Sequence, residues 1–142
     1  MIFWMLDADG EPVATDDALV WGVWMESADR HVLDERVGRV RVSTVFLGLD
    51  HNWHDTRAPV LWETMIFGGV FDDNQYRYRS RLDACRGHVA AVLLVELYRH
   101  APRRVRKSVR KSRRDQTRET RGDARRVSRF LRRHVQLSEV TL

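Results

Sequence analysis

Alternating apolar and polar residues between positions 40 and 67 predict two β-strands. In the run from 40 to 47, every second side chain falls on the same face of an extended chain, and β-branched residues dominate, which favours a strand over a helix. The run from 60 to 67 alternates in the same way, with Pro59 before it and Gly68-Gly69 after it, as is typical of strand ends. Antiparallel pairing of the two runs is the simplest topology.

Two more segments have the pattern of strands. Residues 2–6 are apolar and are expected to form a short first strand, followed by a turn at Asp7-Ala-Asp-Gly10. Residues 31–37 alternate and lead through Gly38-Arg39 into the run at 40. We therefore expect residues 31–67 to form a three-stranded antiparallel meander.

Two helices are predicted from their start signals and apolar spacing. Thr15, as a capping hydroxyl followed by two aspartates, begins a short helix over about residues 16–26. Ser80 and Asp83 form a capping-box pattern that begins a longer helix over about residues 80–98. Apolar residues at helical spacing in the longer helix are expected to face the core: Leu82, Cys85, Val89, Val92, Leu93 and Leu97.

Charge divides the chain into two parts. Residues 1–100 hold 16 acidic and 10 basic residues, and residues 101–142 hold 4 acidic and 15 basic residues, so the net charges are −6 and +11. We predict an acidic α+β domain over residues 1–100, with a three- or four-stranded antiparallel sheet packed by one long and one short helix. Residues 101–142 form a basic, Arg-rich C-terminal extension that has little to bury and is expected to be disordered or partly helical.

One stretch resembles a set of small uncharacterised proteins of phages and prophages. The resemblance rests on Ser43-Thr-Val-Phe-Leu-Gly-Leu-Asp-His51 and Pro59-Val-Leu-Trp-Glu-Thr-Met-Ile-Phe67, with Tyr76-Arg-Tyr78 and Gly87-His88 further along. It covers roughly residues 30 to 95, and the loop Trp53-His-Asp-Thr-Arg57 departs from the more Gly-rich form of that set. It implies a mobile-element context and brings no activity with it.

A candidate ligand site is formed by polar residues at the strand-loop-strand segment. Asp50 and His51 end the first run, and Glu63 in the second alternates with Leu61 and Met65, which places a carboxylate on an apolar face. Such a carboxylate needs a cation, and Arg41, Arg77 and Arg79 are the candidates. We predict binding of a small ligand or a host protein near Asp50, His51, Glu63 and Arg77.

Imidazole and carboxylate groups in the same loop suggest a second chemistry. His51, His54 and Asp55 could hold a divalent metal ion, and Asp50, His51 and His54 would then serve a small metal-dependent hydrolase. The alternative is that Asp50 and His51 shape a turn while His54 and Asp55 are solvated. No metal-binding helix motif or cysteine pair supports the metal site, so no cofactor is expected.

The Arg-rich extension suggests electrostatic binding of nucleic acid, because Arg and Lys neutralise phosphates without reading sequence. With Phe130 as its only aromatic residue, it is better suited to a duplex or structured RNA than to stacking on single strands. A solvated charge run is the alternative. The candidate phosphate contacts are Arg103, Arg104, Arg106, Lys107, Arg110, Lys111, Arg113 and Arg114.

The cysteine count, the N-terminal residues and the length of the apolar runs limit the class of protein that the sequence can encode. A single cysteine, Cys85, cannot form an internal disulfide, which fits a reducing cytoplasm. The N-terminus lacks the basic start of a signal peptide, and the longest apolar run is too short to span a membrane, although residues 89–97 could support self-association. No motif assigns a catalytic residue. We therefore expect a non-enzymatic accessory protein of a phage or prophage, with nucleic-acid binding and metal-dependent hydrolysis as alternatives.

Overall fold

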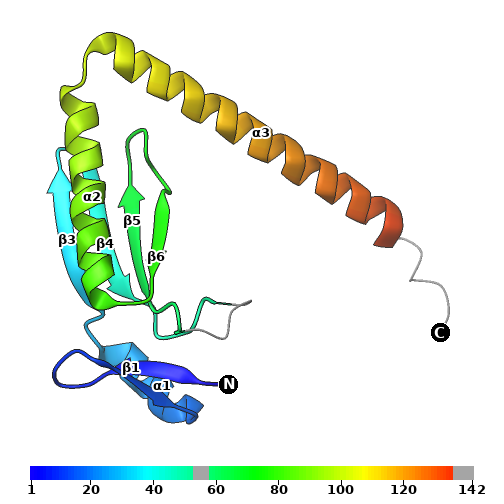
Figure 1. Cartoon of the computed structure of the whole chain (residues 1–142). Coiled ribbons are helices and arrows are strands. Elements are labelled where there is room, and N and C mark those ends of the chain that lie inside the picture. The colour runs from blue at the N-terminus through cyan, green and yellow to red at the C-terminus, as the bar shows by residue number, and fades with distance from the viewer. Residues whose placement is uncertain (53–57, 136–142) are drawn as a thin grey trace. The chain divides into compact units, whose positions relative to one another are not determined.

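The chain divides after His100 into two units, Met1–His100 and Ala101–Leu142, which are described separately. The structure is a computed structural model that describes residues 1–52 and 58–135, with the backbone alone at residues 124 and 127–135. Figure 1 shows an α+β arrangement in the first unit, as predicted. The second unit contains one long helix.

A four-stranded antiparallel sheet in the order β3-β4-β5-β6 forms the centre of the first unit. The predicted meander is confirmed, and a fourth strand follows the turn that begins at Gly68-Gly69. The sequence pattern did not indicate this strand, because it is an edge strand whose side chains are mostly polar and exposed. The strands are β3 (His31–Val37), β4 (Val40–Phe46), β5 (Trp62–Phe67) and β6 (Gln75–Tyr78).

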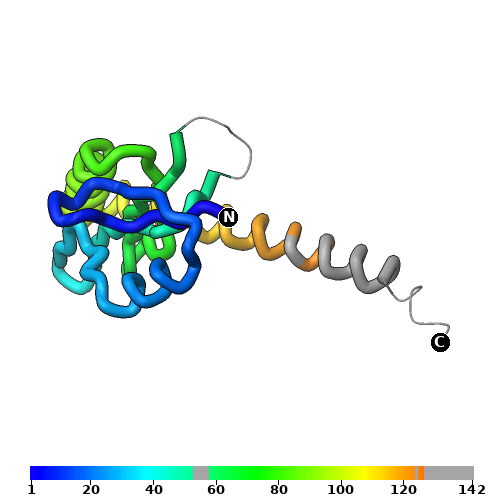
Figure 2. Tube along the Cα trace, turned by 90° about the horizontal axis from the view of Figure 1, so that it is seen from below, coloured from blue at the N-terminus to red at the C-terminus, as the bar shows by residue number. Residues whose placement is uncertain are grey.

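A two-stranded antiparallel hairpin and a short helix lie together at one end of this sheet (Figure 2). The hairpin consists of β1 (Phe3–Leu6) and β2 (Pro12–Thr15), and the backbone amide of Trp4 donates to Gly48 O at 3.0 Å, which joins it to the segment after β4. The first strand is therefore confirmed, and its partner was not anticipated.

The short helix α1 (Ala18–Ser27) begins two residues later than predicted. Its cap is Asp17, whose carboxylate accepts from the amides of Leu19 at 2.9 Å and Val20 at 3.1 Å. Thr15, the predicted cap, instead accepts from the amide of Asp17. Asp17 is the cap in place of Thr15 because its charged carboxylate accepts from two free amide groups at the positive end of the helix dipole.

The long helix α2 (Arg81–His100) covers one face of the four-stranded sheet. Ser80 caps the helix as predicted, since its hydroxyl accepts from the Asp83 amide at 3.1 Å. The Asp83 side chain accepts from the Ser80 hydroxyl at 2.7 Å, whereas a complete capping box has it accept from the backbone amide.

The predicted buried stripe of α2 was wrong at four of its six positions. The helix buries Ala84, His88, Ala91 and Val95 against the sheet, whereas Leu82, Val89, Leu93 and Leu97 are exposed. Cys85 and Val92 are partly buried, and Val92 packs against the core. Small residues face the sheet because the helix approaches it closely: a Cβ added at Gly87 would lie 2.0 Å from the hydroxyl of Tyr78. The bulkier stripe would hold the helix too far away.

Two apolar clusters fill the space between α2 and the sheet. One centres on Val42, Ile66 and Val95, and the other on Phe46 and Trp62, whose rings meet edge to face. Even-numbered residues of β4 and β5 supply these side chains, as the alternation in the sequence predicts.

The second unit contains helix α3 (Arg103–Val135), which continues through Gly122 without a break. The extension was expected to be disordered or partly helical, and the structure has a helix over residues 103–135. Arg, Lys, Gln and Glu are all strong helix formers, and no proline follows Pro102. Hydroxyls of Thr117 and Thr120 also donate to carbonyls four residues back at 2.9 Å. The helix propensity of these residues therefore favours α3 even though the segment has few apolar side chains to bury.

Candidate functional site

Glu63 is held in an ion pair on the face of the sheet opposite α2. The residue is 6% exposed, and its Oε2 accepts from Arg77 Nε at 2.9 Å and from Gln75 Nε2 at 2.7 Å. Glu63 and Arg77 are also direct cross-strand partners in the β5–β6 register. Of the three arginines proposed as its partner, Arg77 is the one observed. The pair carries little free charge and holds β6 onto the sheet.

Asp50 and His51 occupy a different place. The Asp50 carboxylate accepts from the amides of Asn52 and Val60, both at 2.9 Å, which closes the ends of the loop. Both residues line a cavity of about 400 Å³ together with Met1, Ile2, Trp4, Leu49 and Pro59, and Glu63 is not among its lining residues. Within residues 1–52 and 58–135, no hydrogen bond or ion pair joins Asp50 or His51 to Glu63 or Arg77. The described contacts therefore join two of the four predicted ligand residues.

The predicted metal site is only partly within the described chain. His54 and Asp55 lie outside the described residues. Within the described part, no group of three or more His, Cys, Asp or Glu side chains could hold a metal ion. Among the described residues, His51 lines the mainly apolar cavity with Asp50.

A row of buried polar groups crosses the sheet beneath α2, between the two apolar clusters. The hydroxyls of Thr44 and Thr64 are 2.7 Å apart, and Thr44 Oγ1 is 2.9 Å from His88 Nδ1. Burial raises the pKa of the Tyr78 phenol, and its interaction with Thr64 opposes that shift. His88 is 2% exposed, because its small neighbours on α2 let the imidazole reach Thr44.

Burial lowers the pKa of the His88 imidazole below its usual 6.5, against the opposing attraction of Glu35 and Asp34. Nε2 of His88 lies 3.9 Å from the Glu35 carboxylate, which is largely exposed and gives little compensation. The folded protein therefore binds this proton less readily than the unfolded chain. Its contribution to stability is complete above pH 6.5 and declines as the pH falls from there towards the lowered pKa.

We expect His88→Asn to remove that part of the pH dependence. An amide can retain a hydrogen bond to Thr44 and does not titrate. The free energy of unfolding, measured by urea denaturation at several pH values below 6.5, should fall less steeply for the variant than for the wild type. His100→Asn, at an exposed position on the same helix, is the control and should follow the wild-type curve. Identical slopes for His88→Asn and wild type would contradict the prediction.

Helix α3 carries an uninterrupted basic face. Because successive residues of an α-helix are about 100° apart, side chains at spacings of three and four share one side. Eight exposed residues obey this spacing and lie within an arc of about 100°: Arg103, Lys107, Arg110, Lys111, Arg114, Arg118, Arg121 and Arg125. The sequence prediction included five of them, but its other three residues, Arg104, Arg106 and Arg113, lie off this face.

Over residues 103–123, the opposite side of α3 carries no basic side chain. It holds Val105, Val109, Ser112, Gln116 and Thr120, together with the acidic residues Glu119 and Asp123. In this part of the helix, two valines among polar side chains are too little apolar surface for insertion between lipid headgroups. The helix is therefore amphipathic mainly in charge.

The exposed side of α2 is the second unusual surface. Leu82, Val89, Leu93 and Leu97 recur at helical spacing, and Leu97 is 72% exposed. Self-association through residues 89–97 therefore stays a prediction, with exposed apolar side chains in the segment it names. Within the described residues, no helix is both long and apolar enough to cross a membrane.

Comparison of the chain with protein-family models, curated proteins and solved structures found no match. The resemblance to phage and prophage proteins therefore stays a prediction. The α+β fold follows from the arrangement of strands and helices.

Proposed function

We propose that this chain is a nucleic-acid-binding accessory protein that contacts phosphates through the basic face of α3. The observation that carries the proposal is the alignment of eight exposed Arg and Lys side chains along one side of a continuous helix. The interval from Arg103 to Arg125 corresponds to about 33 Å of helix, close to one turn of a DNA duplex. A duplex presents phosphates along that whole length.

Phosphate contact without sequence reading is the mode that these residues support. Arg and Lys donate to phosphate oxygens and displace condensed counterions, while base-specific contacts need a defined set of side chains in a groove. No aromatic residue occurs between Arg103 and Arg129, so stacking on unpaired bases is disfavoured. The polar character of the opposite face disfavours an anionic membrane. A duplex or a structured RNA backbone is the preferred partner.

The test is binding of the full chain to unrelated DNA and RNA duplexes at several salt concentrations, followed by fluorescence anisotropy. We expect log K to fall linearly with log salt concentration for every duplex. The variant Lys107→Gln/Arg110→Gln/Arg114→Gln/Arg118→Gln should bind at least about tenfold more weakly, with a salt slope reduced by about 3 to 4. Glutamine is a good helix former, so circular dichroism should show unchanged helix content.

The control removes the same charge from the first unit, with Arg36, Arg39, Arg86 and Arg99 each changed to Gln. Because these side chains lie on other elements, this variant should keep the wild-type affinity and salt slope. Equal weakening by both quadruple variants would mean that net charge alone governs binding. That result, or an unchanged slope in the α3 variant, would overturn the assignment of the contact to α3.

A further inference from the structure

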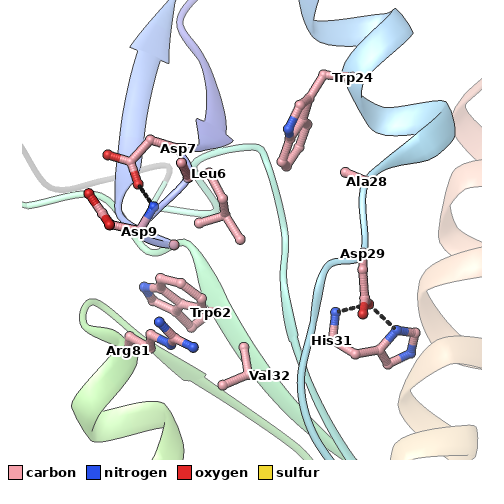
Figure 3. Close-up of a pocket in the computed structure, with 12 residues that line it drawn as sticks. Leu6, Asp7, Asp9, Trp24, Ala28, Asp29, His31, Val32, Trp62 and Arg81 are labelled. Carbon is pink, nitrogen blue, oxygen red and sulfur yellow. Dashed lines mark hydrogen bonds and ion pairs between the residues drawn. The ribbon is translucent and has the colours of Figure 1, made fainter.

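A cavity of about 380 Å³ lies where five elements of the first unit meet (Figure 3). The β1–β2 turn, the end of α1 and the starts of β3, β5 and α2 all contribute to it. The volume is within the range of small-molecule sites, about 300–1,000 Å³. None of its lining residues was singled out as a site from the sequence, because they are scattered from Leu6 to Arg81.

One end of the cavity carries three polar groups without partners. Trp62 is 1% exposed, and its indole N–H has no hydrogen-bond acceptor. In the part of the chain that the structure describes, the Arg81 guanidinium and the Asp9 carboxylate, both of exposed residues, have no ion pair or side-chain hydrogen bond either. Figure 3 shows the indole nitrogen on the side of the ring that faces Asp9 and Arg81. Two donors and one carboxylate therefore belong to residues that line the same cavity.

The backbone at this end is shaped to admit the guanidinium. Gly10 has φ +79°, and a Cβ added there would lie 2.8 Å from Arg81 Nη1. A larger residue would be strained at this φ and would displace Arg81. The Asp7 carboxylate accepts from the amides of Asp9 and Glu11, both at 2.9 Å, and holds the turn against the cavity.

The other end of the cavity is apolar. Trp24 points into the space from α1, and Leu6 and Val32 lie around it (Figure 3). Ala28 lines the same end. Asp29 and His31 also line the cavity, and they contact each other, with His31 Nδ1 3.3 Å from Asp29 Oδ1. A ligand here would therefore have a polar head and an apolar body.

We propose that this cavity binds an α-amino acid with an apolar side chain. Its carboxylate would accept from Arg81 and from the indole N–H of Trp62, and its ammonium group would donate to Asp9. Its side chain would lie against Leu6, Trp24 and Val32. A simple anion is disfavoured by the carboxylates of Asp7, Asp9 and Asp29, and a simple cation would leave the donors of Arg81 and Trp62 unsatisfied. A zwitterion satisfies both sets of groups.

The test compares leucine, phenylalanine and tryptophan with molecules that lack half of the head group, using the full chain. Calorimetry and the indole N–H resonances of the five tryptophans provide two independent readouts. At least one amino acid should bind and shift the Trp62 indole resonance downfield. The matching amine without a carboxylate and the matching acid without an amine should each bind at least about tenfold more weakly, as expected for loss of one charged hydrogen-bonding group.

Two variants locate the head group. Arg81→Gln and Asp9→Asn should each weaken binding at least about tenfold. The matched controls Arg86→Gln and Asp16→Asn, at exposed positions outside the cavity, should leave it unchanged. No binding by any of the three amino acids at about 10 mM would overturn the proposal. So would equal binding of amine, acid and amino acid, or an unmoved Trp62 indole resonance.

Discussion

Gly87→Ala is expected to destabilise the first unit by about 3 kcal/mol, at the upper end of the usual cost of overpacking a core. The new Cβ would lie 2.0 Å from the hydroxyl oxygen of Tyr78 and 2.2 Å from its Cζ, both far inside contact distance. Either α2 moves off the sheet or the ring moves, and both changes disturb the packing of Tyr78 against the core cluster of Phe46 and Trp62. Urea denaturation followed by circular dichroism measures the loss.

Gly22→Ala is the matched control within the same unit. Gly22 also lies inside a helix, but a Cβ added there meets nothing within 4 Å. Without a clash, alanine should stabilise α1 by about 0.5–1 kcal/mol through its better helix propensity. Both substitutions replace glycine by alanine, yet the changes they cause in the free energy of unfolding should have opposite signs. A stabilising Gly87→Ala would show that α2 does not approach Tyr78 as closely as described.

Arg77→Met is expected to cost about 2–3 kcal/mol, because it leaves the buried Glu63 carboxylate without its cation. The amide of Gln75 remains as a donor, and Arg77 itself is partly exposed, so the cost should be below that of a fully buried pair. Methionine preserves the aliphatic length of the arginine stem. The free energy of unfolding at neutral pH is the measurement.

Arg41→Met gives the comparison, since Arg41 also pairs with a carboxylate across neighbouring strands. Its partner, Asp34, has a side chain 36% exposed, against 8% for Glu63, so water can replace the lost arginine. The loss for Arg41→Met should be clearly smaller. The double variant Glu63→Leu/Arg77→Met should recover most of the stability lost in Arg77→Met. Equal losses for both arginines would show that the burial of Glu63 has no energetic consequence.

Local pattern predicted the elements whose signals are strong and short in range. The alternation over β4 and β5 was sufficient to place both strands and their core faces, since a strand has only two faces. Ser80 and Asp83 likewise announced the start of α2, because a capping box involves residues three apart. Strands β2 and β6 were missed because their side chains are mostly exposed and they exist through backbone pairing with a neighbour.

The candidate surfaces show the same division. The basic face of α3 depends on helical spacing within one segment, so the sequence already contained most of it, and only the helical geometry sorted Arg118, Arg121 and Arg125 onto it. The amino-acid cavity could not be anticipated, because Asp9, Trp62 and Arg81 come from separate elements. Whether Arg41, Arg77 or Arg79 would pair with Glu63 also depended on strand register.

By itself, the sequence determined an acidic α+β unit with a central antiparallel meander, and a strongly basic extension after it. These properties follow from composition and from side-chain periodicity, which act between near neighbours. Tertiary structure alone decided which side of α2 is buried. The apolar stripe of Leu82, Val89, Leu93 and Leu97 was the stronger signal, yet the small side of the helix faces the sheet. The close approach of Gly87 to Tyr78 leaves no room for a larger side chain at that point, whereas His88 fits because its imidazole reaches the Thr44 hydroxyl. Both constraints arise only once the sheet is in place.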